Sequence, residues 1–162
     1  MAHPSFKLIE TLREAADRLR NGAAYAWGHH GTCNCGHILQ VATDFDAKKI
    51  IQYAHTGIGE WSELSSGECA ITDAPVNFLL ATLENLGLTG TDIHHLEYLT
   101  DREVLNQVEG GFRWLKKNQK QDVIAYFEAF AVLMEQKMLT QIRLPKELLD
   151  GQIVEESELV LA

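Results

Sequence analysis

The sequence has few of the residues that staple or interrupt a fold. Its 162 residues include three cysteines and three prolines, and two of the cysteines, Cys33 and Cys35, are separated by a single residue. An odd number of cysteines with one pair so close together does not fit the disulfide framework of a secreted domain. The first residues also lack the charged segment and apolar block of a secretory signal. We therefore expect reduced thiols and a cytoplasmic protein.

Basic charge and long apolar runs are scarce as well. Lysine and arginine total 14 against 23 aspartates and glutamates, which gives a net charge of −9. That sign repels phosphate backbones and anionic lipid headgroups. The most apolar stretch, residues 124–134, is interrupted by Glu128 and is shorter than the ~18 apolar residues that cross a bilayer. We expect neither nucleic acid nor a membrane as a partner, and the sequence leaves other partners and the oligomeric state open.

Helical periodicity is what the sequence has in abundance. Apolar residues recur at steps of three and four, and Ser, Thr, Asp and Gly stand where helices begin and end. The pattern predicts these helices: one from Phe6 to Leu19, one after His37, one capped by Asp46, one between Asp73 and Gly87, one opened by Thr91, one opened by Thr100 and ended by Gly110 and Gly111, and the longest after Asn118. Convincing period-two alternation, the mark of strands, is missing.

These signals favour an all-α fold. We expect a single-domain irregular bundle of about six to seven helices over residues 1–145, with a Gly/Cys/His-rich loop between the first two. Residues 55–72 carry glycines and serines without helical spacing, and a loop of that length is usually functional or disordered. Residues 146–162 follow as an acidic C-terminal tail.

The Gly/Cys/His-rich loop concentrates side chains that bind metals. Residues 27–37 read Trp-Gly-His-His-Gly-Thr-Cys-Asn-Cys-Gly-His. Zn²⁺ takes thiolate and imidazole donors in tetrahedral sites, and glycines let a turn bring closely spaced donors together. Because a third cysteine lies in the loop at 55–72, the two loops together predict a zinc site. Its candidate ligands are Cys33, Cys35, His37, Cys69, His29 and His30.

Such an ion has two possible roles. Four protein ligands would make a structural site that clamps the two loops, and its affinity would add to the folding energy. Three protein ligands would leave a position for a water that hydrolyses a substrate, with Glu60, Glu63 or Glu68 available as a general base. The sequence does not decide between these roles.

A cysteine nucleophile is the alternative interpretation. If Asn34 or Thr32 caps the following helix, Cys35 lies in its first turn, where unpaired amides and the helix dipole lower a thiol pKa. A nearby imidazole such as His37 would then act as general base. Further candidates for the base are His29, His30, His94 and His95.

Two interpretations need no chemistry at the turn. The chain can be a non-catalytic interaction domain that presents its acidic surface to a basic partner. The turn can also be a packed connection, since free cysteine behaves as a small buried hydrophobe. The basic run Lys116, Lys117 and Lys120 beside Trp114 indicates a solvated face before the longest helix.

The same residues carry a resemblance. The signature Trp-Gly-His-x-Gly-x-Cys-Asn-Cys-Gly-His at 27–37, with Gly-Glu-Trp-Ser-Glu at 59–63 and Cys69 downstream, resembles an uncharacterised family of small bacterial proteins. The resemblance covers about Tyr25 to Leu105 and implies no activity. It implies that Trp27, the Cys-Asn-Cys-Gly-His turn, Trp61 and Cys69 belong to one local structure, which supports joining Cys69 to the site.

Overall fold

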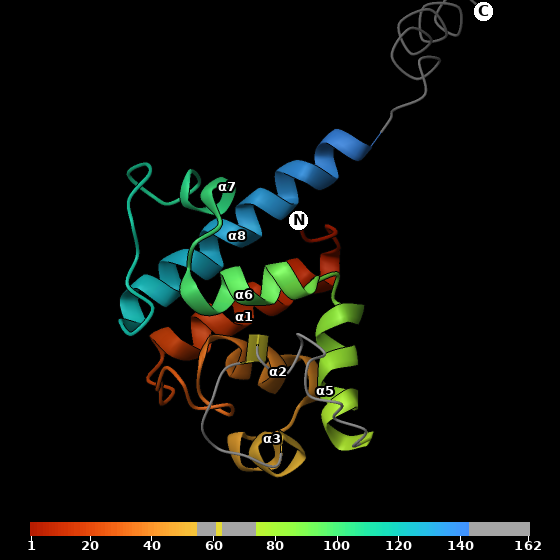
Figure 1. The fold of residues 1–162 in the computed structure, drawn as a ribbon. Coiled ribbons are helices and arrows are strands. Elements are labelled where there is room, and N and C mark those ends of the chain that lie inside the picture. The colour runs from red at the N-terminus through yellow and green to blue at the C-terminus, as the bar shows by residue number, and fades with distance from the viewer. Residues whose placement is uncertain (55–60, 63–73, 143–162) are drawn as a thin grey trace, which may run out of the picture.

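The computed structural model describes residues 1–54, 61–62 and 74–142. Within these ranges the chain is an all-α, single-domain helical bundle, which confirms the predicted fold class (Figure 1). The helices whose bounds lie inside them are α1 (Phe6–Arg20), α2 (Asn34–Thr43), α3 (Ala47–Ala54), α5 (Ala74–Asn85), α6 (Gly90–Tyr98), α7 (Arg102–Leu105) and α8 (Lys120–Gln141). No helix in this part of the chain is long and apolar enough to cross a membrane.

Helices α1 and α8 form the largest packed pair of the bundle. The side chain of Ser5 caps α1 by accepting a hydrogen bond from Leu8 N at 3.1 Å, and two arginines in the last turn suit the negative end of the helix. Helix α8 crosses the whole molecule (Figure 1), with α1 and α7 packed against it. Its buried residues are Val123, Ile124, Tyr126, Phe127, Ala129, Phe130, Ala131, Leu133 and Met134.

Helix α2 is the centre of the other half of the molecule. It contacts α1, α3, α5 and α6. Its first six residues, 34–39, are all buried, although a surface helix of this length would show an exposed polar face. The Cys-Asn-Cys-Gly-His turn is therefore part of the interior, at the start of a helix that is enclosed on several sides.

Helices α2, α6 and α7 have boundaries that differ from the prediction, and at the starts of α6 and α7 the reason is a different capping side chain. Helix α2 begins at Asn34 rather than after His37, with Cys33 as its N-cap. Helix α6 begins after Thr89 rather than at Thr91, because the hydroxyl of Thr89 and the carboxylate of Asp92 form a reciprocal capping box.

Helix α7 departs most from expectation. Asp101, not Thr100, caps it by accepting from Glu103 N at 2.9 Å, and it ends at Leu105 instead of continuing to Gly110 and Gly111. Several predicted features lie outside the described residues. These are Asp73, most of the loop at 55–72 including Cys69, and the tail at 146–162.

The core of α1 gives a direct test of this packing. Leu12 is fully buried, whereas Phe6 on the same helix is 72% exposed. We expect Leu12→Ala to lower the free energy of unfolding by about 2–5 kcal/mol, because it removes buried methyl groups and leaves a cavity. Phe6→Ala should change it by less than about 0.5 kcal/mol. Urea denaturation measures both values, and equal losses would contradict this arrangement.

Candidate functional site

The site begins in a compact turn that leads into α2. Ala26 N donates to Thr32 O at 3.2 Å, and Cys33 N donates to His29 O at 2.8 Å, so the backbone folds back on itself before the helix starts. Gly28 lies inside this turn with φ of +80°, a conformation that glycine adopts at little cost.

Two further glycines let the turn pack against its neighbours. A Cβ on Gly36 would lie 2.5 Å from the carbonyl oxygen of His30, and a Cβ on Gly31 would lie 2.6 Å from that of Ala47. Both obstacles are backbone atoms, which cannot rotate away as a side chain could. Glycine at these positions thus lets the turn lie flat on the first turn of α2 and on α3.

The two thiols of the turn are sealed from solvent. Cys33 is 3% exposed and Cys35 is 0% exposed. Burial raises the pKa of the Cys33 thiol to about 12, although the backbone N–H groups of Gly36 and Cys35 pull it down. Burial, followed by the nearby charges of Glu97 and Cys33, raises the pKa of Cys35 well above its ordinary value. Both thiols are therefore protonated at neutral pH when no metal is bound.

This result corrects one expectation about Cys35. The residue does lie in the first turn of α2, as predicted, but its pKa is raised, not lowered. The reason is that Cys35 is fully buried, and that burial shifts a pKa by more than a helix terminus does. The structure therefore gives no support to Cys35 as an activated nucleophile.

The three histidines of the turn have separate surroundings. The Nε2 atom of His37 lies 2.9 Å from Ala24 O, and burial lowers the pKa of His37, so the ring is neutral. His30 is fully buried with its ring 5.0 Å from that of Trp61, while His29 is exposed. Across residues 1–54, 61–62 and 74–142, no three His, Cys, Asp or Glu side chains lie close enough to hold a metal ion together. Cys69 lies outside these ranges.

Glu97 is a central member of the site that sequence reasoning missed. It is 3% exposed, and its carboxylate accepts hydrogen bonds from Trp61 N, from Ser62 N at 3.2 Å and from Ser62 Oγ at 2.7 Å. Its backbone carbonyl accepts from Trp27 Nε1 at 3.2 Å. Trp61 in turn donates its indole N–H to His30 O at 3.1 Å. These bonds confirm that Trp27, Trp61 and the turn share one local structure.

Asn34 and Tyr25 extend this network to the other side of the turn. The Asn34 Nδ2 atom donates to the carbonyls of Leu96 and Glu97, each at 2.9 Å. The Tyr25 hydroxyl lies 2.6 Å from Asn34 Oδ1 and also hydrogen-bonds Lys117 O. The one hydroxyl proton of Tyr25 is thus shared between two acceptors, and the carboxamide of Asn34 is hydrogen-bonded at both its nitrogen and its oxygen.

Lys117 belongs to this site, contrary to the predicted solvated face. Its ammonium nitrogen lies 3.8 Å from the ring centroid of Trp27 and 4.2 Å from that of Tyr98. The Lys120 ammonium is also engaged and donates to Ala23 O at 2.7 Å. Lys116 and Trp114 are exposed, so the prediction holds only for part of the basic run.

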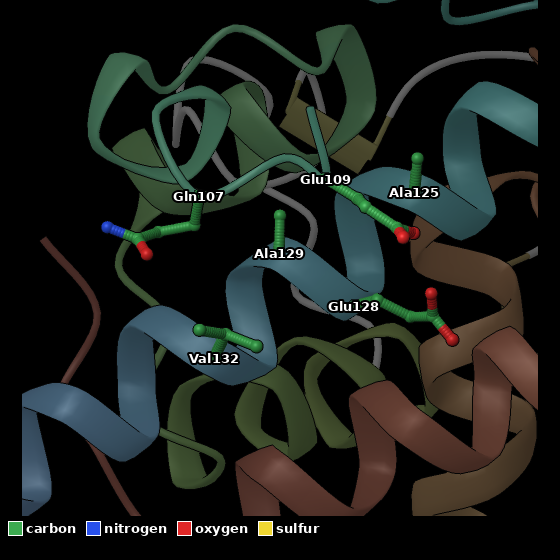
Figure 2. Close-up of a pocket in the computed structure, with 6 residues that line it drawn as sticks. All are labelled: Gln107, Glu109, Ala125, Glu128, Ala129 and Val132. Atoms are coloured by element: carbon green, nitrogen blue, oxygen red, sulfur yellow. The ribbon is translucent and has the colours of Figure 1, made fainter. Parts of the chain in front are cut away.

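Two surface hollows among the described residues lie away from the turn. One of about 230 Å³ opens on α8, where Ala125, Ala129 and Val132 form its floor and Glu109 and Glu128 lie at one end (Figure 2). Another, of about 340 Å³, is lined by Phe6, Ile9, Glu135, Met138, Leu139 and Ile142. Neither contains a residue that the sequence singled out for chemistry.

No family model, curated protein or solved structure matches the chain. The resemblance stated from the signature therefore stays a prediction.

The buried thiols make stability depend on pH in a defined direction. The unfolded chain ionises Cys33 near pH 9, whereas the folded, metal-free protein keeps it protonated to about 12. The folded state binds more protons between these values, so this stabilisation is complete below pH 9 and is lost as pH rises. We expect the free energy of unfolding of the metal-free protein, measured by urea denaturation, to fall above pH 9. In Cys33→Ser the fall should be shallower, by up to about 1.4 kcal/mol per pH unit. Identical slopes would show that Cys33 is not buried as described.

Proposed function

We propose that the Cys33–His37 turn binds a thiophilic divalent metal ion, with zinc as the first candidate, and that the bound ion has a structural role. The observation that supports this most is that both thiols of the pair lie in one dry compartment at the N-terminal end of α2. The two sulfurs are near enough for the charge of Cys33 to raise the pKa of Cys35.

The electrostatics of this compartment favour a cation as the partner of ionised thiols. Two thiolates beside the Glu97 carboxylate would place three negative charges in a dry interior, at a cost that burial alone makes prohibitive. A divalent ion displaces the two thiol protons and offsets both charges. The backbone N–H groups of Gly36 and Cys35 lower the pKa of Cys33 in part, so they favour its thiolate form.

The coordination set needs donors beyond the two thiols. His30 and His37 lie on the same turn and are engaged elsewhere, so a site would require one of these rings to turn or another ligand to enter. Cys69 is the further donor that the sequence predicts. A structural role is favoured over a hydrolytic one because both thiols are closed to solvent, whereas a hydrolytic ion needs an open position for water.

Metal content tests this proposal. We expect the untagged native protein, purified without chelators, to carry about one zinc per chain by elemental analysis. Cys33→Ser and Cys35→Ser should each lose the ion, and Cys69→Ser decides whether that residue is a ligand. His94→Gln is the matched control, because it removes an exposed imidazole of α6 and should leave the metal content unchanged.

Two further measurements interpret the result. Far-UV circular dichroism of each serine variant shows that a lost ion does not reflect a lost fold. If the wild-type protein contains no metal, zinc is titrated against a chromophoric chelator that binds it with micromolar affinity. Failure to compete for zinc in that titration would overturn the proposal.

A further inference from the structure

The segment between α7 and α8, residues 112–119, passes along the side of the molecule that carries the thiol turn. It runs down one edge of the bundle from the turns after α7 to the start of α8 (Figure 1). We call residues 112–119 the strap. It follows Gly110 and Gly111, whose φ angles of +88° and +99° are readily available only to glycine. The strap thus begins directly after a backbone turn that glycine allows.

Lys117 fastens the strap at two points. Its carbonyl accepts a hydrogen bond from the Tyr25 hydroxyl. Its ammonium lies over two aromatic rings at once, 3.8 Å from the centroid of Trp27 and 4.2 Å from that of Tyr98. These two rings stand edge to face with centroids 5.9 Å apart, and Trp27 is held in place by its bond to Glu97 O. The pair is therefore a preorganised cation site that the chain fills with its own lysine.

Tyr25 lies between the strap and the thiols. Its hydroxyl reaches Lys117 on one side and Asn34, the first residue of α2, on the other. Asn34 stands between Cys33 and Cys35 in the chain, so the hydroxyl of Tyr25 is bonded to the residue that separates the two thiols. Lifting Lys117 would remove one of the two acceptors that hold this hydroxyl over the compartment.

We propose that Trp27 and Tyr98 form a binding site for an organic cation, which Lys117 occupies as a latch that keeps the strap closed over Cys33 and Cys35. An ammonium ligand that takes the place of Lys117 releases the strap and opens the route to the thiols. A cation over aromatic rings contributes about 0.5–2 kcal/mol. Loss of the latch should therefore raise the open population about two- to thirtyfold. The inference goes beyond the proposed metal site and does not depend on it.

Thiol labelling in metal-free protein tests the latch. On a Cys69→Ser background, only Cys33 and Cys35 react, and a small neutral disulfide such as 4,4′-dithiodipyridine reports their access under native conditions. We expect Lys117→Ala to label about two- to thirtyfold faster. Lys117→Arg should label near the wild-type rate, because a guanidinium also binds aromatic faces. Lys116→Ala is the matched control, since it removes the same charge from an exposed neighbour.

A competing cation tests the site itself. Tetramethylammonium chloride should accelerate labelling in the protein that carries Lys117, compared with sodium chloride at equal concentration, and should have no such effect in Trp27→Ala. Two results would overturn the inference. One is labelling of Lys117→Ala at the wild-type rate, or faster only by the factor that its free energy of unfolding predicts. The other is an effect of tetramethylammonium no larger than that of sodium chloride. Because the protein is metal-free throughout, neither result bears on zinc binding.

Discussion

The carboxamide of Asn34 holds together the two helices from which the site is built. Its N–H groups bind the carbonyls of Leu96 and Glu97 near the end of α6, where helix carbonyls lack partners within their own helix. Its oxygen meets the hydroxyl of Tyr25. One side chain at the start of α2 thereby completes the end of α6 and fixes the tyrosine that borders the thiols. Trp27 and Asn34 bind the same carbonyl, that of Glu97, and Tyr25 connects Asn34 to the strap.

The interior around the thiols is polar without being reactive. Tyr25, Asn34, Trp61 and Glu97 are hydrogen-bonded there, and a buried network of that kind selects one arrangement because each broken bond leaves an unpaired group in a dry environment. The same dryness keeps Cys33 and Cys35 protonated. Chemistry at this turn therefore requires something that changes protonation or access. The proposed metal ion would change the first, and the proposed release of the strap would change the second.

The sequence predicted the fold well because local signals decide it. The apolar stripe of α1 and the cap at Asp46 need only near neighbours, and both appear in the structure. The turn at residues 27–37 was also identified, since clustered cysteines and histidines are rare. What the sequence could not predict was that this turn is buried in the interior. A cysteine in the first turn of a helix has a low pKa on a surface and a high one inside, and only the tertiary packing of α2 distinguishes these cases.

The residues that sequence reasoning missed share one property. Glu97 stands between apolar positions of a short helix, and Lys117 stands in a run of charges. Each therefore looks like a charged side chain exposed to solvent. Their roles arise from contacts with residues distant along the chain. Glu97 accepts hydrogen bonds from Trp61 and Ser62, and the ammonium of Lys117 lies over the ring of Trp27. A pattern within one element carries no information about such partners.

The separation of Tyr25 and Lys117 along the sequence has a consequence for protein synthesis. They are hydrogen-bonded across 92 residues, and at about 5–20 residues per second the ribosome needs roughly 5–20 s to make that interval. Until the interval is complete, the cysteines lack the residues of α6 and of the strap that later pack beside the turn. The nascent chain is thus a stage at which these thiols are still open to solvent, before the bundle closes around them.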